Sequence, residues 1–288
     1  MAAPVTISPY RVSTITVNGN VSAELVSSVV FAGLPILGPD EVGDGFLFAE
    51  RMGEGGQLMT RGHNPRDRSR RRKAIAAAGG GGACRFMHQT TVVYRYGAQT
   101  PNIKIFDKGS LHLTGVKDVV AGERIVDRVI EALRAIPGAT RFPDATMKNH
   151  NYKVRMINVD FQLNGWGISR DRLFDALDRN THLKIVYEAN TYQALKVHYY
   201  INESKLQQNG CCDCHADPTL KCPGKGEGKN LTDCKRVTLS IFGTGKMMII
   251  GASAMAHVDH VYAFVKGMLP EHFAAVHVPL PKKSYSVV

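Results

Sequence analysis

The sequence predicts an α+β fold in which two pseudo-symmetric repeats each form an antiparallel sheet with helices on one face. Two observations lead to this prediction. A segment of 31 residues recurs without a gap 136 positions later, and within each copy the apolar spacing changes from the strand period to the helix period. The composition suits a folded chain, because 44% of the 288 residues are apolar and 21% are charged.

The internal repeat is the clearest of these signals. Residues 103–133 read IKIFDKGSLHLTGVKDVVAGERIVDRVIEAL, and residues 239–269 read LSIFGTGKMMIIGASAMAHVDHVYAFVKGML. A second echo precedes each copy, where VNGNVSAEL from Val17 matches LNGWGISRDRL from Leu163 after a two-residue insertion. We therefore expect a first repeat over residues 1–140 and a second over residues 150–280, joined near Pro143.

Each copy begins with two strands and ends with a helix. In the first copy Ile103, Ile105, Leu111 and Leu113 alternate with polar residues, which indicates one buried sheet face, and Gly109 supplies the turn. Apolar residues then recur at helical spacing and predict a closing helix. They are Ile125, Val126, Val129, Ile130 and Leu133 in the first repeat, and Val258, Val261, Phe264, Val265 and Met268 in the second.

Two segments interrupt this plan. Residues from about 38 to 82 are rich in glycine and arginine and are interpreted as a flexible insertion in the first repeat. Its basic run from Arg61 to Lys73 is either a solvated loop or localisation signal, or an arm that contacts phosphates. Residues from about 202 to 235 contain five of the six cysteines and form an insertion in the second repeat.

The charge favours a polyanionic partner. Lys and Arg number 36 against 25 Asp and Glu, a net charge of +11, which is typical of proteins that bind nucleic acid or acidic membranes. The N-terminal sequence lacks the features of a signal peptide, and no apolar run reaches the about 18 residues of a membrane span. We expect a soluble, intracellular protein with no membrane partner.

The sheet face without helices is the candidate binding surface. Met248 and Ile250 alternate with the core residues Met247 and Ile249, so both faces of that strand are apolar. Such surface marks an interaction site, unless an insertion or a dimer partner covers it. Phe106 and Phe242 break the alternation at equivalent places, which suggests a pair of wedges that unstack DNA bases rather than two core side chains.

Residues 105–115 and 241–251 resemble the repeat signature of the TATA-binding protein family, in which a phenylalanine, a glycine turn and a strand precede a long helix. The segment from Tyr187 to Tyr199 is similar to the family segment that carries the second wedge of a pair, a place that Tyr192 occupies. The resemblance implies a saddle: one curved antiparallel sheet, with helices on the convex face and the DNA minor groove on the concave face.

The resemblance also implies the residues that contact DNA. Asn158 matches the central asparagine of the saddle, whereas Ser13 or Thr14 falls at that place in the first repeat, and Asp160 is an unexpected charge beside it. Polar residues replace apolar ones of the family at Lys104, His112 and Ser240, and Ile250 replaces a threonine. The implied DNA-binding residues are the wedges Phe106, Phe242, Tyr192 and Phe86, together with Asn158, Thr114, Lys104, His112, Met248 and Ile250.

The function implied is that of a transcription initiation factor that binds and bends promoter DNA as a monomer. Its partners would be double-stranded DNA, a transcription factor IIB-like protein and RNA polymerase. The large insertions are similar to those of factors from large DNA viruses, so the expected location is the nucleus or a cytoplasmic viral factory. No catalytic constellation or phosphate loop is present, so we do not expect an enzyme. The alternative is a protein-interaction scaffold without sequence-specific DNA binding.

The cysteine insertion suggests a metal site. Cys212, Cys214, Cys222 and Cys234 are expected to hold one Zn²⁺ through four thiolates, with Cys211 and His215 as competing ligands. Reduced thiols or a local disulfide are the alternatives. On the layout of the TATA-binding protein family, this insertion extends the loop that docks transcription factor IIB.

Overall fold

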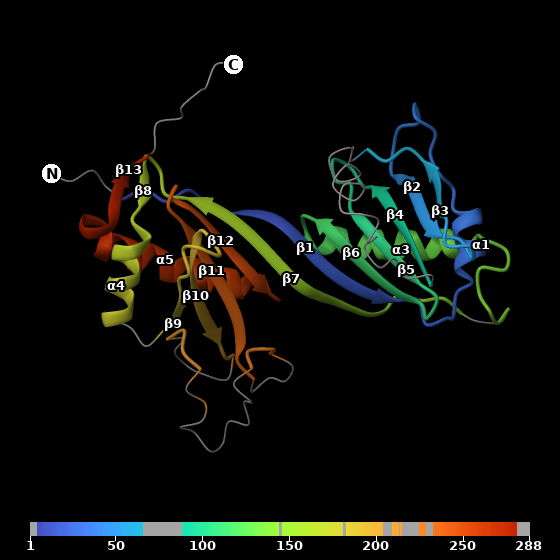
Figure 1. Ribbon diagram of the computed structural model, residues 1–288. Coiled ribbons are helices and arrows are strands. Elements are labelled where there is room, and N and C mark those ends of the chain that lie inside the picture. The colour runs from blue at the N-terminus through green and yellow to red at the C-terminus, as the bar shows by residue number, and fades with distance from the viewer. Residues whose placement is uncertain are drawn as a thin grey trace, which may run out of the picture. The chain divides into compact units, whose positions relative to one another are not determined.

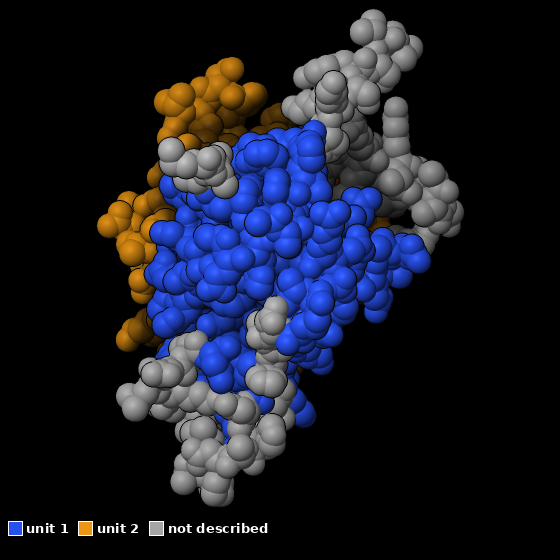
Figure 2. Space-filling view, turned by 90° about the vertical axis from the view of Figure 1, so that its left-hand side faces the viewer, with its two compact units in different colours: residues 1–13, 155–288 blue, residues 14–154 orange. Residues whose placement is uncertain are grey.

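The computed structural model describes residues 5–65, 88–143, 146–180, 183–203, 209–212, 214, 225–228 and 233–280. It divides into two compact units, shown in Figure 2. The first-repeat unit is Thr14–Val154, and the second-repeat unit combines Met1–Ser13 with Arg155–Val288. The described residues before Thr14 thus pack with the second repeat, whereas the expected first repeat began at residue 1.

The first-repeat unit contains an antiparallel sheet in the strand order β3-β2-β4-β5-β6-β1 (Figure 1). Two helices accompany it: α1 contacts β2 and β4, and α3 contacts β6. The strands are β1 (Arg11–Asn20), β2 (Gly45–Met52), β3 (Leu58–Gly62), β4 (Gln89–Arg95), β5 (Asn102–Phe106) and β6 (Ser110–Val116), and the helices are α1 (Ser27–Gly33) and α3 (Val119–Arg134).

The helix α3 closes the core of this unit as the sequence predicts. Its apolar stripe is buried, as are the alternate residues of β5 and β6. The Asp118 side chain caps the helix by accepting a hydrogen bond from the Ala121 N–H at 2.8 Å. Burying each large aliphatic side chain stabilises the fold by about 1.5–3 kcal/mol, so the apolar stripe determines which face α3 turns to the sheet.

The prediction of a flexible insertion over residues 38–82 is wrong for residues 45–62. These residues form β2 and β3, which pair with each other and extend the sheet beyond β4. Phe46, Phe48 and Ala49 of β2 are buried, and this apolar content stabilises the strand despite the glycines around it. Residues 66–82 of the predicted insertion lie outside the described residues.

The second-repeat unit has the strand order β7-β12-β11-β10-β9. The helix α5 (Met255–Val276) contacts β11 and β12, whereas α4 (Arg170–Asn180) contacts β9, β10 and α5. Two short strands, β8 (Trp166–Ile168) and β13 (His277–Pro279), pair separately. The five main strands are β7 (His150–Gln162), β9 (Lys184–Val186), β10 (Ala194–Ile201), β11 (Lys235–Phe242) and β12 (Lys246–Ala252).

Strand register defines which residues of the two repeats are equivalent. Val17 pairs with Leu113, and Val159 pairs with Ile249, which lies 136 positions after Leu113. Val17 therefore corresponds to Val159. The predicted match of Val17 with Leu163 is wrong, because it aligned an Asn-Gly pair that lies inside β1 with one that lies in a bend after β7.

The turn glycines confirm the corrected register. The Val21 N–H donates to the Gly109 carbonyl at 2.9 Å, and the Leu163 N–H donates to the Gly245 carbonyl at the same distance. Each repeat thus follows the same order of strand, short helix, strands and closing helix. The expected α+β class with two antiparallel repeats is confirmed. Among the described residues, no helix is long and apolar enough to cross a membrane.

Candidate nucleic-acid interface

The second repeat presents a sheet face opposite its buried core, here called the second open face. It carries the alternate side chains of β7, β12, β11 and β10, of which Met248 and Ile250 are half-buried while Met247 and Ile249 are fully buried. Met248 pairs with Asp160 on one side and Ser240 on the other. Two apolar side chains of β12 therefore lie in the middle of this face, and Met248 lies between the polar residues Asp160 and Ser240.

The predicted wedge pair of this repeat comes together at the end of β11. The rings of Tyr192 and Phe242 lie 6.1 Å apart at an interplanar angle of 62°, and Tyr192 is 39% exposed. The Lys196 ammonium lies 4.2 Å from the centre of the Tyr192 ring, a cation–π contact. This arrangement offers an accessible aromatic edge beside a positive charge.

Asn158 lies on the same face and fixes the end of β12. Its side-chain oxygen accepts a hydrogen bond from the Gly251 N–H at 3.1 Å, and its carbonyl accepts one from the Ser13 hydroxyl at 2.9 Å. In the first repeat the Gly115 N–H donates to the Thr14 hydroxyl oxygen at 3.1 Å. An equivalent glycine amide is therefore bonded to a polar side chain in both repeats.

The strand position equivalent to Asn158 is nevertheless Thr16. Ile15 pairs with Val116 and Ile157 with Ala252, again 136 positions apart, so the residues that follow them correspond. The prediction of Ser13 or Thr14 at that place is wrong by two or three residues. Thr16 lies between the buried residues Ile15 and Val17, and its equivalence to Asn158 follows from the strand register of the folded sheet.

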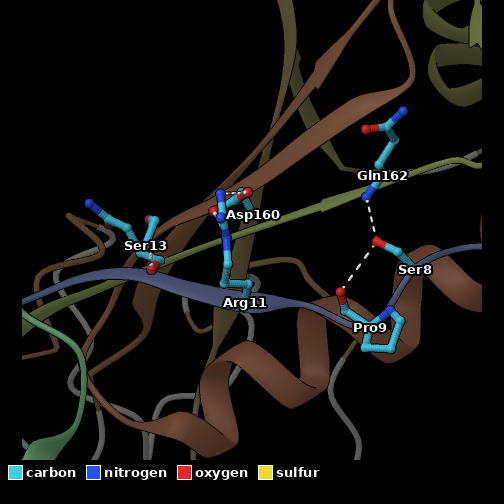
Figure 3. Close-up of polar contacts among 7 residues, drawn as sticks. Ser8, Pro9, Arg11, Ser13, Asp160 and Gln162 are labelled. Atoms are coloured by element: carbon cyan, nitrogen blue, oxygen red, sulfur yellow. Dashed lines mark hydrogen bonds and ion pairs between the residues drawn. The ribbon is translucent and has the colours of Figure 1, made fainter. Parts of the chain in front are cut away.

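Asp160, the unexpected charge of the second open face, is paired with Arg11 (Figure 3). The two guanidinium nitrogens Nη2 and Nε lie 2.9 and 3.4 Å from its carboxylate oxygens. The carboxylate is only 15% exposed, whereas the Arg11 side chain is 78% exposed. The acidic residue is thus neutralised by a cation that itself faces solvent. No local pattern predicts Arg11, because 149 positions separate the partners.

Ser8 aligns the segment before β1 along β7. Its N–H donates to the Gln162 carbonyl at 2.9 Å. Its hydroxyl oxygen accepts from the Gln162 N–H at 3.0 Å (Figure 3). The Tyr10 hydroxyl donates to an Asp259 oxygen at 2.7 Å, which raises the pKa of Tyr10 to about 12. These bonds explain why the described residues before Thr14 belong to the second-repeat unit.

A basic cluster on β9, β10 and β11 consists of Lys184, Lys196 and Arg236 around His198. His198 pairs with Lys184 on one side and with Thr238 on the other. Burial lowers the pKa of His198, and the charges of Arg236, Lys184 and Lys196 lower it further. His198 therefore stays neutral near pH 7, and the positive charge of the cluster comes from its Lys and Arg side chains.

The first repeat presents a more polar open face. Lys104 pairs with His112, and Asn102 pairs with Thr114, with all four half-buried. Phe106 is half-buried at the end of β5 beside Gln89. Its predicted partner wedge, Phe86, lies outside the described residues. Toward β4 and β2 this face is less accessible, because Phe48, Gln89, Thr91 and Val93 are buried.

Three of the four predicted zinc ligands converge. The thiol sulfurs of Cys212, Cys214 and Cys234 all lie within 4.8 Å of one another. Cys222 and the competing ligand His215 lie outside the described residues. The other competitor, Cys211, is described but does not join this group.

Comparisons with known proteins bear on the resemblance. No family model matches the chain. A TATA-box-binding protein-like protein of Acanthamoeba polyphaga mimivirus is 25% identical over 188 residues, which cover 62% of this chain and 45% of that protein. The TBP of Methanococcus jannaschii aligns in structure with a TM-score of 0.46 at 14% identity, over 92% of this chain and 99% of that one. The expected resemblance is confirmed: the chain is similar to a viral TATA-box-binding protein-like protein, and it spans less than half of that protein's length.

Proposed function

We propose that the chain binds double-stranded DNA through the minor groove and bends it, acting as a transcription initiation factor. The observation that carries this proposal is the second open face, where Met248 and Ile250 form an accessible apolar centre and Tyr192 and Phe242 form an aromatic edge. Minor-groove proteins, TATA-binding protein itself among them, insert apolar wedges between base steps and kink the duplex.

The charges near this face support the same proposal. Lys196 lies beside the aromatic edge, Lys184 and Arg236 lie near His198 on the outer strands, and the chain as a whole carries a net charge of +11. Cations at the rim of an apolar centre suit a duplex, whose phosphates flank the groove. The exposed Arg11 side chain offsets the single carboxylate on this face, so it removes a repulsion that would oppose DNA binding.

The test is equilibrium binding to random duplexes at several salt concentrations, followed by selection of the preferred sequence. We expect the affinity to fall as salt rises, with a slope of about 0.9 per phosphate neutralised. We also expect dyes on the two DNA ends to move closer together on binding, because the duplex bends. A transcription factor IIB-like protein and RNA polymerase would then be tested as partners on the bent DNA.

A matched pair of variants distinguishes a specific role of the second open face in DNA binding from the general effect of adding a negative charge to the protein. Met248→Asp places a carboxylate in the apolar centre and should weaken binding at least tenfold. Val120→Asp introduces the same charge on α3, where Val120 is 54% exposed, and should leave binding near that of the wild type. Absent or salt-independent DNA binding would refute the proposal and favour a protein-interaction scaffold instead.

A further inference from the structure

The connection between β10 and β11 gathers three cysteine thiols near the end of the sheet. Parts of this connection bond to the two strands: the Tyr200 N–H donates to the Gly210 carbonyl at 2.8 Å, and the Arg236 N–H donates to the Gly226 carbonyl at 2.9 Å. Gly210 lies shortly before Cys212 and Cys214, and Cys234 directly precedes β11. The backbone thus brings both ends of the connection to one place.

The distances between the sulfurs suit a metal ion better than a disulfide. The sulfurs of Cys214 and Cys234 lie 3.2 Å apart, and all three sulfurs lie within 4.8 Å of one another. A disulfide requires about 2.05 Å. Thiolates held at about 2.3 Å from a tetrahedral Zn²⁺ lie roughly 3.8 Å apart, which is longer than the Cys214–Cys234 separation and within the 4.8 Å limit that holds for all three sulfurs. The third thiol would also have no role in a disulfide.

A buried amide provides a second, independent observation. Asn202 is 1% exposed, and its Nδ2 lies 3.5 Å from the Cys214 sulfur and 3.8 Å from the Cys234 sulfur. Cys214 and Cys234 are themselves 2% and 1% exposed. An N–H group directed at two buried sulfurs provides them with a hydrogen-bond donor, and such hydrogen bonds are typical of the shell around a metal–thiolate centre.

We propose that Cys212, Cys214 and Cys234 bind one Zn²⁺ ion that ties the β10–β11 connection to the end of the sheet. Each thiol releases its proton to solvent as its Zn–S bond forms, so the affinity rises with pH. A tetrahedral ion needs a fourth donor, and no other described His, Cys, Asp or Glu joins this group.

The ion would act together with a second anchor of the same connection. His257 near the start of α5 lies 3.1 Å from a carboxylate oxygen of Glu203, just after β10, and His257 is 5% exposed. The metal would hold the far part of the connection while this contact holds its beginning to the helix.

The experiment measures metal content in the full chain purified without chelator. We expect one zinc per chain, and we expect Co²⁺ exchanged into the site to show the absorption of a tetrahedral thiolate complex. Cys214→Ser and Cys234→Ser should each weaken Co²⁺ affinity at least tenfold. Cys84→Ser, which changes a cysteine outside the connection, should bind Co²⁺ as the wild type does. Parallel Cys211→Ser and Cys222→Ser variants identify the fourth donor by the same loss.

Several outcomes would overturn this site. The site is excluded if the wild-type chain shows no thiolate absorption with Co²⁺. It is also excluded if the Cys214→Ser and Cys234→Ser variants bind Co²⁺ as the wild type does. A disulfide between Cys214 and Cys234, found by mass spectrometry of the unreduced protein, excludes it as well. If the variants fail to fold, a wild-type melting temperature that does not fall on addition of chelator decides against the site. Because the readout is metal binding, failure here is distinguishable from failure to bind DNA.

Discussion

Replacing Arg11 by alanine should weaken DNA binding by exposing the negative charge of Asp160. Because the Arg11 side chain is 78% exposed, the pair contributes only about 0.2–1 kcal/mol to folding, and Arg11→Ala should fold normally. On DNA the effect is larger. A carboxylate in a groove about 6 Å wide lies roughly 7 Å from a phosphate, a repulsion of about 0.6 kcal/mol in water and about 2.4 kcal/mol at an effective dielectric of 20.

This repulsion corresponds to a loss of affinity between about 3-fold and 60-fold. Fluorescence anisotropy with one labelled duplex at fixed salt measures it. The double variant Arg11→Ala with Asp160→Asn should recover wild-type affinity, because it removes both charges, and Asp160→Asn alone should bind as tightly or more tightly. Thermal melting of each variant checks that the fold is unchanged.

Two results would refute this reasoning. Arg11→Ala that binds DNA like the wild type shows that Asp160 lies away from the duplex. A double variant that stays as weak as Arg11→Ala shows that Arg11 contacts phosphate directly, and the salt slope should then fall by about 0.9.

Three further predictions concern the wedge, the turn and the N-terminal segment. Phe242→Ala should reduce the DNA bend more than Phe106→Ala, because Tyr192 lies beside Phe242; energy transfer between dyes on the DNA ends measures this, and equal bends would contradict it. Gly245→Ala should lower the free energy of unfolding by more than about 1 kcal/mol in a denaturant titration. The reason is that φ of Gly245 is +78° and the added Cβ would lie 2.4 Å from the Trp166 carbonyl oxygen. Gly267→Ala is the control that should not destabilise the protein, because no atom lies close to its added Cβ. The pKa of Tyr10 is raised to about 12 from 10.0, so its contribution to stability is complete below pH 10 and is lost as the pH rises through 12. Because the pKa of Tyr152 is also raised to about 12, Tyr10→Phe should reduce this loss of stability without abolishing it. A phenolate absorbance titration that is identical in the wild type and Tyr10→Phe near pH 12 would exclude the Asp259 bond.

The sequence predicted the parts of the fold in which local pattern and packing agree. The strands β5, β6, β11 and β12 and the closing helices follow from apolar periodicity, and the gapless repeat assigns the same faces in both copies. The strand β2 was missed because glycines and charges surround its apolar core residues. The register of β1 was missed because an Asn-Gly pair favours a turn in isolation, yet sheet pairing keeps it extended.

The residues of the candidate site likewise divide into those that a local sequence pattern predicted and those that depend on strand pairing. Alternation along β12 was enough to place Met248 and Ile250 on the open face, and the cysteine spacing was enough to group three of the four expected ligands. Pairing between distant segments was beyond such patterns. The bond between Arg11 and Asp160 and the position of Thr16 both depend on strand register, which is fixed by the folded sheet.

Equivalent positions of the two open faces differ in polarity, and this difference predicts which repeat contributes more to DNA affinity. Met248 and Ile250 of the second repeat correspond to His112 and Thr114 of the first. A fully buried Met or Ile gains about 1.5–3 kcal/mol, and these two are already half-buried, so the groove would add about 1 kcal/mol for each. Met248→His with Ile250→Thr should therefore weaken DNA binding by roughly 10-fold to 30-fold. The reciprocal change, His112→Met with Thr114→Ile, should strengthen it, with both double variants measured by anisotropy against the same duplex. If the first double variant binds like the wild type while the reciprocal one loses affinity, the polar face of the first repeat, and not the apolar centre of the second, determines the affinity.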